Sequence, residues 1–186
     1  SILTDSLKKQ IYYYEDSLKN KNIVIDSLYK HIDNIIYSTE YIKFKVYIKS
    51  NIIIPNNFSE NHLLLIYKES KKYNIPTDIL FRLLRIESSF KKRALSNKGA
   101  FGYFQLMSST FNDYNTDDIK HLNIYEKNII IGIRYLNDLH IFWIEKYIWK
   151  LTLVSYNSGL QTVINSKGIP NIKDTKEYIK YIMKYK

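Results

Sequence analysis

The sequence has 186 residues, 45% of them hydrophobic and 25% charged. These are ordinary values for a folded globular protein, so the composition excludes wholesale disorder. The longest aliphatic runs are three or four residues, whereas a membrane-spanning helix needs about 20, and no span is expected. The net charge of +10 does not predict a nucleic-acid partner, because the lysines form no stripe and Lys, Ile, Asn and Tyr are all favoured by AT-rich codons.

Residues 3–36 contain neither glycine nor proline and follow a heptad pattern. One seam position is occupied by Ile11, Leu18, Ile25 and Ile32, and the other by Leu7, Tyr14, Lys21, Leu28 and Ile35. Seven of these nine residues are aliphatic over four heptads, which predicts a coiled-coil helix. Two interpretations stay open: a long helix packed along its own domain, and a homo-oligomer formed through a parallel coil, which Tyr14 and Lys21 would weaken.

The apolar period then changes to two. Ile42, Phe44, Val46 and Ile48 alternate with tyrosines and lysines, which predicts a half-buried strand over 41–49. Its partner would be residues 52–54 or another chain, because a lone strand is not stable. We therefore predict an N-terminal coiled-coil helix with a short β segment over 1–58, and a second domain over 59–186. All five glycines lie after residue 98, so a functional site is expected in the second domain.

A carboxylate stands out in the helix predicted from Thr77 to Ser88. At about 100° per residue, Leu80, Leu83 and Leu84 share one face of this helix, and Glu87 falls in the middle of that face. Burial against leucines raises the pKa of a carboxyl group, as a general acid working near neutrality requires. Position alone leaves two alternatives open, a side chain swung out at the helix end and a pair with a buried lysine.

The residues after Glu87 carry a longer motif. Glu87-Ser88-Ser89-Phe90 is followed, over 94–110, by Ala-Leu-Ser-Asn-Lys-Gly-Ala-Phe-Gly-Tyr-Phe-Gln-Leu-Met-Ser-Ser-Thr. This pattern closely resembles the soluble lytic transglycosylase domain of the lysozyme-like superfamily, which cleaves bacterial peptidoglycan. Further blocks resemble the family in the same order, and the resemblance spans roughly 62–184. These blocks are Asn128-Ile129-x-x-Gly132-x-x-Tyr135-Leu136, Ser155-Tyr156-Asn157-Ser158-Gly159 and Thr175-x-x-Tyr178.

Four positions depart from the family pattern without removing a reacting group. Serine replaces alanine at Ser155 and Ser158, Ser108 stands where the family usually has proline, and Phe104 where it usually has methionine. The resemblance implies a mainly α, lysozyme-like catalytic domain after the N-terminal helix and β segment.

The resemblance also implies a reaction with one catalytic carboxyl group. Glu87 would protonate the leaving oxygen of the β-1,4 bond between N-acetylmuramic acid and N-acetylglucosamine. The muramoyl C6 hydroxyl would then attack C1 and leave a 1,6-anhydro end, with Glu87 accepting its proton. The stretch 88–112 contains no Asp or Glu, in keeping with a reaction that needs no second carboxylate.

Other residues receive roles from their type and their position in the family pattern. Tyr156 is expected beside Glu87, able to hydrogen-bond it, while Asn157 fixes local backbone and Tyr178 supports the site. Together with Glu87 the expected substrate-binding residues are Ser96, Gly99, Gln105, Met107, Tyr156, Asn157 and Tyr178. No metal or other cofactor is predicted, because the four histidines lack ligand spacing and cysteine is absent.

Two alternative functions and two settings remain open. A goose-type lysozyme would hydrolyse the same bond on the same fold, and an inactive wall-binding or structural virion protein would use the coil as its working part. The expected partner in each case is the peptidoglycan glycan strand. The location is expected outside the cytoplasm, in the periplasm or cell envelope or in a phage virion. The chain opens at Ser1 without a visible leader, so a processed or trimmed form is expected.

Overall fold

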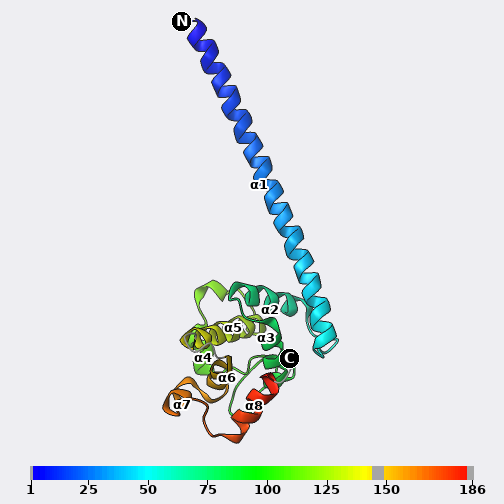
Figure 1. Cartoon of the computed structure of the whole chain (residues 1–186), viewed down its shortest axis with the longest axis vertical. Helices are drawn as coiled ribbons and strands as arrows, with labels where there is room; N and C mark the ends of the chain where they lie inside the picture. The colour runs from blue at the N-terminus through cyan, green and yellow to red at the C-terminus, as the bar shows by residue number, and fades with distance from the viewer. Residues whose placement is uncertain (1, 144–148, 184–186) are drawn as a thin grey trace. The chain divides into compact units, whose positions relative to one another are not determined.

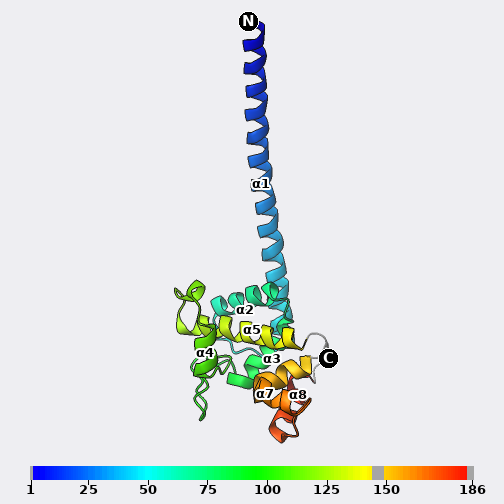
Figure 2. The same cartoon turned by 90° about the vertical axis from the view of Figure 1, so that its left-hand side faces the viewer.

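The computed structural model describes residues 2–143 and 149–183, with side chains from Ser6 onward. It is mostly helical (Figures 1 and 2), as the sequence predicts. Contacts divide the chain into two units, Ser1–Tyr47 and Ile48–Lys186. The helices are α1 (Ile2–Asn51), α2 (Glu60–Lys72), α3 (Thr77–Ser88), α4 (Ser108–Tyr114), α5 (Ile124–Phe142), α6 (Trp149–Ser158), α7 (Leu160–Asn165) and α8 (Lys173–Met183), with the 3-10 turn η1 (Asp117–Ile119) between α4 and α5.

The helix α1 is continuous over 50 residues, which confirms a long N-terminal helix. The strand predicted over 41–49 is wrong, because these residues are the last turns of α1. A pattern that alternates over so few residues also places apolar residues four apart, as on one face of a helix. In the structure Phe44, Ile48 and Ile52 are buried, whereas Ile42 and Val46 are exposed. No glycine or proline interrupts the chain before Pro55, so nothing in the backbone ends the helix at residue 41. The domain boundary at residues 58 and 59 stays a prediction.

The second unit is built around α5. Figures 1 and 2 show α5 running through the middle of this unit, and α2, α4 and α6 pack against it. Its side chains Ile129, Ile131, Ile133 and Leu136 are fully buried. Residues 128–133 of α5 are all buried, so more than one full turn is covered on every side, as expected of a central helix. Helix α8 packs on α6 and also on α3. The contact with α3 brings the last helix of the second unit against one of its early helices.

Two residues of α5 hold the loop that follows α3. The buried amide of Asn128 accepts a hydrogen bond from the backbone N–H of Phe104 at 3.0 Å and donates one to the carbonyl of Phe101 at 2.8 Å. Gly132 lies so close to Phe104 that a Cβ there would stand 2.3 Å from its ring. The glycine therefore permits a close approach between helix and loop, and α5 fixes the loop from both positions.

Candidate active site

Glu87 lies in the last turn of α3, on the face that the sequence analysis assigned to it. Leu80, Leu83 and Leu84 on the same face are fully buried, and the Glu87 carboxyl group is itself largely enclosed. Burial raises the pKa of this carboxyl to about 7, against a hydrogen bond that favours the ionised form. Near neutrality the group is therefore divided between its acid and base forms, which suits a residue that gives and takes a proton.

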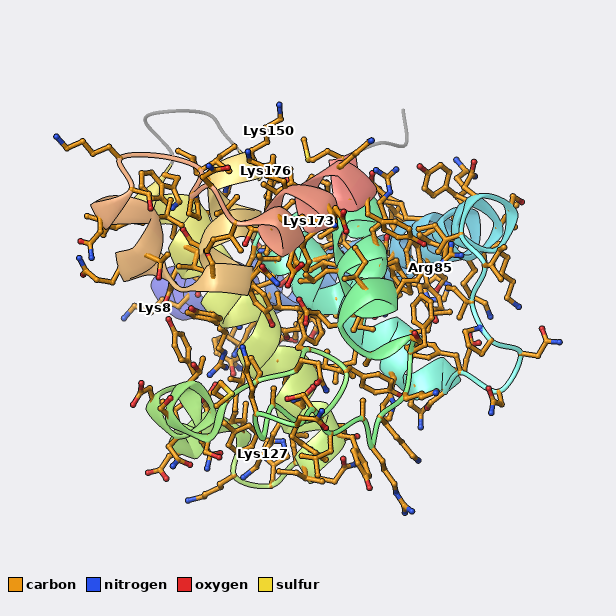
Figure 3. The ribbon with its side chains drawn as sticks, turned by 90° about the horizontal axis from the view of Figure 1, so that it is seen from below. Lys8, Arg85, Lys127, Lys150, Lys173 and Lys176 are labelled. Carbon is orange, nitrogen blue, oxygen red and sulfur yellow. The ribbon has the colours of Figure 1, made fainter. Side chains whose placement is uncertain are left out.

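The hydrogen bond to Glu87 comes from Tyr178 on α8. Its hydroxyl donates to Glu87 Oε1 over 2.7 Å, and the contact between α3 and α8 brings the two residues together. Figure 3 shows these helices side by side, with Arg85 labelled on α3 and Lys173 at the start of α8. Burial and the nearby carboxylate raise the pKa of Tyr178 well above its usual value. The phenol therefore keeps its proton and remains a donor.

The backbone immediately after Glu87 adopts an uncommon conformation. Ser89 and Phe90 have left-handed backbone angles, with φ of 50° and 63°, a region that bulky side chains rarely occupy. Phe90 is held there by its burial and by an edge contact with Phe58 whose ring centroids are 5.7 Å apart. This turn stops α3 at Ser88, so that Glu87 sits at the end of the helix and not along its side.

Tyr156 and Asn157, the two α6 residues predicted for the site, lie near Glu87 but bond elsewhere. The Tyr156 hydroxyl donates to the carbonyl oxygen of Phe104 over 2.7 Å, so the expected bond to Glu87 is made by Tyr178 instead. The Glu87 charge adds to burial in raising the pKa of Tyr156, in keeping with its place close to the carboxyl. Asn157 Oδ1 accepts a hydrogen bond from the Thr175 hydroxyl at 3.3 Å, which ties α6 to α8.

The other predicted residues lie in the loop after α3, where two of them stabilise the loop itself. Ser96 Oγ accepts from the N–H of Ala100 at 3.0 Å, and Gln105 Nε2 donates to the carbonyls of Gly102 and Ala94 at 2.9 and 3.2 Å. Gly99 has φ of +85°, with open space where a Cβ would point. The Met107 side chain is half exposed, so it is accessible to a ligand.

A pocket of about 560 Å³ opens where α3, α6 and α8 meet. Glu87 does not line it, but its neighbour Ile86 and its hydrogen-bond partner Tyr178 do. The pocket lining brings Asn157 and Tyr178 together, and does not include Ser96, Gly99, Gln105 or Met107. Its residues are Arg85, Ile86, Ser89, Asn157, Asp174, Glu177, Tyr178 and Tyr181.

Helix α8 contributes three further residues to this pocket that were not predicted from the sequence. Asp174, Glu177 and Tyr181 flank Tyr178 at helical spacing, so all four point from one face of α8. That periodicity around Thr175-x-x-Tyr178 was a usable signal.

Among residues 2–143 and 149–183, no group of three or more His, Cys, Asp or Glu side chains is placed to hold a metal ion. None of the described helices combines the length and apolar character that a membrane crossing requires.

Comparison with known proteins identifies a matching family model and a solved structure of similar fold. A family model described as Transglycosylase SLT domain matches residues 64–179, more than half of the chain. Among solved structures, an inactive mutant of the lytic transglycosylase Slt from Pseudomonas aeruginosa superposes with a TM-score of 0.56 at 19% identity. The match covers 81% of this chain and 28% of that one. This likeness confirms the predicted fold.

Proposed function

Because the chain belongs to the transglycosylase SLT domain family, we propose that it is a peptidoglycan lytic transglycosylase with Glu87 as its catalytic acid and base. The observation that carries the proposal is the partly buried Glu87 carboxyl, whose pKa is raised to about 7 and which accepts a hydrogen bond from Tyr178. The similar Slt protein is inactive as a mutant in which glutamine replaces a glutamate. An enzyme that cleaves peptidoglycan acts outside the cytoplasm, so the proposed location is a bacterial envelope or the point of phage entry.

The proposed reaction exchanges one bond at C1 of N-acetylmuramic acid for another. Neutral Glu87 donates its proton to the glycosidic oxygen as the C1–O4 bond breaks, and N-acetylglucosamine leaves with that proton. The C6 hydroxyl of the same muramoyl sugar attacks C1, and the Glu87 carboxylate accepts the hydroxyl proton. No water is consumed, and attack within one sugar has a high effective molarity. Tyr178 supports the carboxylate stage, because its hydrogen bond favours the ionised form.

The predicted binding residues then divide by position. Asn157 and Tyr178 line the pocket between α3, α6 and α8 and are proposed to contact the glycan directly. Gly99 and Met107 offer open or exposed positions on the loop, and are proposed to contact it farther along. Ser96 and Gln105 are proposed to shape the loop, with polar atoms available to N-acetyl groups when the glycan binds. Tyr156 is proposed to fix the same loop through Phe104.

A hydrolase is the second candidate, and the α8 carboxylates are the observation that favours it. Asp174 and Glu177 line the same pocket as Tyr178, the hydrogen-bond partner of Glu87, although 88–112 contains no carboxylate. In an inverting glycosidase such a group would activate water opposite the acid. The two mechanisms release different products from the same bond.

The product distinguishes the two mechanisms. Purified peptidoglycan digested by this chain is expected to yield muropeptides with 1,6-anhydro ends, each one water lighter than the product of a lysozyme. Mass spectrometry of the digest, with a lysozyme digest of the same wall alongside, reads this difference directly. Reducing ends alone would assign the hydrolase, and a digest that releases no muropeptides would assign an inactive wall-binding protein.

The pH dependence of the rate tests the Tyr178 hydrogen bond. With a Glu87 pKa near 7, kcat/KM is expected to fall as the pH rises through about 7, because only the neutral carboxyl donates. Tyr178→Phe removes a bond that favours the ionised form, so this fall should move to higher pH. Tyr156→Phe is the matched control, since its hydroxyl bonds to Phe104, and it should leave the midpoint in place. A midpoint that stays put or moves down in Tyr178→Phe contradicts the assignment.

A further inference from the structure

The helix α1 carries an apolar seam that is longer than the sequence analysis indicated. Because residues 41–49 are helical, the heptad continues past residue 36. Between residues 7 and 46 it has twelve seam positions, of which all but Lys21 and Thr39 are apolar. We call the apolar set the α1 seam, and it consists of Leu7, Ile11, Tyr14, Leu18, Ile25, Leu28, Ile32, Ile35, Ile42 and Val46.

The α1 seam is uncovered in the part of the chain that the structure describes. Its least exposed member, Ile25, still has 47% of its surface accessible, and Tyr14 has 65%. Isolated exposed apolar residues are ordinary, but a contiguous stripe of this length marks an interaction surface.

Helix propensity does not account for α1 by itself. Its 50 residues include no alanine, and many are isoleucine, tyrosine, asparagine, serine or aspartate, which favour helix less than alanine or leucine does. In water, most helical stability comes from packing of an apolar face. A helix of this composition therefore needs its seam covered.

The charged residues of α1 lie almost entirely outside the seam positions. Of the twelve Asp, Glu and Lys residues between 6 and 46, Lys21 alone occupies a seam position. Lys8, Glu15, Lys43 and Lys45 flank the seam, and the remaining seven lie on the outer face. This segregation is the pattern of helices that associate along a heptad seam and present their charges to water.

We propose that the α1 seam is an interface with the same seam of a second copy of this chain. A heptad seam is complementary to itself, because each apolar layer of one helix meets an apolar layer of the other. From Leu7 to Val46 the seam is about 60 Å long on a helix about 10 Å wide. Two copies would thus bury roughly 1,200 Å², the lower end of the range for stable specific interfaces. Lys21 is the point at which the interface is weakened.

The mass of the chain in solution tests the proposal. Light scattering on the 186-residue chain is expected to give at least twice 22.3 kDa at high micromolar concentration. On dilution the mass should fall toward 22.3 kDa, and far-UV circular dichroism should show a parallel loss of helix. A mass of 22.3 kDa at the highest concentration would overturn the proposal.

Matched substitutions separate the seam from general surface hydrophobicity. Ile25→Glu places a charge on the seam, whereas Ile23→Glu makes the same change on the outer face, at a residue that is 58% exposed. Glutamate favours helix at both sites. The Ile25 variant is expected to lose at least about tenfold in affinity between copies, and the Ile23 variant to retain it. Lys21→Leu should tighten the assembly. Equal loss in both glutamate variants, or a weaker assembly with Lys21→Leu, would overturn the proposal.

Discussion

Glu87→Gln is expected to lower the rate of peptidoglycan cleavage by about 10²–10⁴-fold, the usual cost of losing a general acid. Glutamine has nearly the same size and keeps an oxygen that can accept the hydrogen bond from Tyr178, but it has no proton to transfer. The fold should survive, because a neutral amide is no harder to bury than an ionised carboxylate. The rate of muropeptide release at fixed enzyme concentration measures the loss.

The matched control is Glu177→Gln, the same substitution at an exposed glutamate of the adjoining pocket. If Glu87 is the sole acid and base, this control should keep most of the wild-type rate. A loss in Glu177→Gln as large as that in Glu87→Gln would assign a second catalytic carboxylate and favour hydrolysis. A Glu87→Gln variant that digests wall as fast as wild type would remove Glu87 from the mechanism.

The sequence predicted α3 and the place of Glu87 on it because both depend on local spacing. The face with Leu80, Leu83 and Leu84 follows from helical periodicity alone, and the glutamate falls on that face one turn later. The motif after Glu87 likewise reflects local needs: Gly99 and Gly102 take positive φ angles of 85° and 82° within the loop, a conformation that favours glycine. Features set within one element or one turn could be predicted.

Features set by contacts between distant segments could not. The partner of Glu87 is Tyr178, 91 residues away, and spacing cannot decide between it and Tyr156, which stands in an equally suitable block. The strand predicted over 41–49 failed for a related reason. The alternation of Ile42, Phe44 and Val46 fits a strand. In the structure Phe44 is buried and Ile42 and Val46 are exposed, a difference that the sequence pattern does not contain.

Stability should depend on pH through Glu87, and the sign follows from its pKa. The carboxyl titrates near 4.5 in the unfolded chain and near 7 in the folded one, so the folded state holds the proton more tightly. Stability from this group is fully present below pH 4.5 and is lost as the pH rises through 7. The loss amounts to about 3 kcal/mol, because one pKa unit corresponds to 1.36 kcal/mol. The ionised Glu87 carboxylate therefore destabilises the folded state at alkaline pH, as a consequence of the raised pKa that keeps the group protonated near neutrality.

Glu87→Gln should remove that dependence while leaving the rest of the titration curve unchanged. His62 and His140, whose pKa values burial lowers, contribute the opposite slope near neutrality, and they are common to both proteins. The difference in unfolding free energy between variant and wild type therefore isolates Glu87. Urea denaturation across the pH range should show a difference that is small near about pH 4 and grows to about 3 kcal/mol in favour of the variant near about pH 9. A difference that stays constant with pH would mean that the folded state does not hold Glu87 as a buried neutral acid.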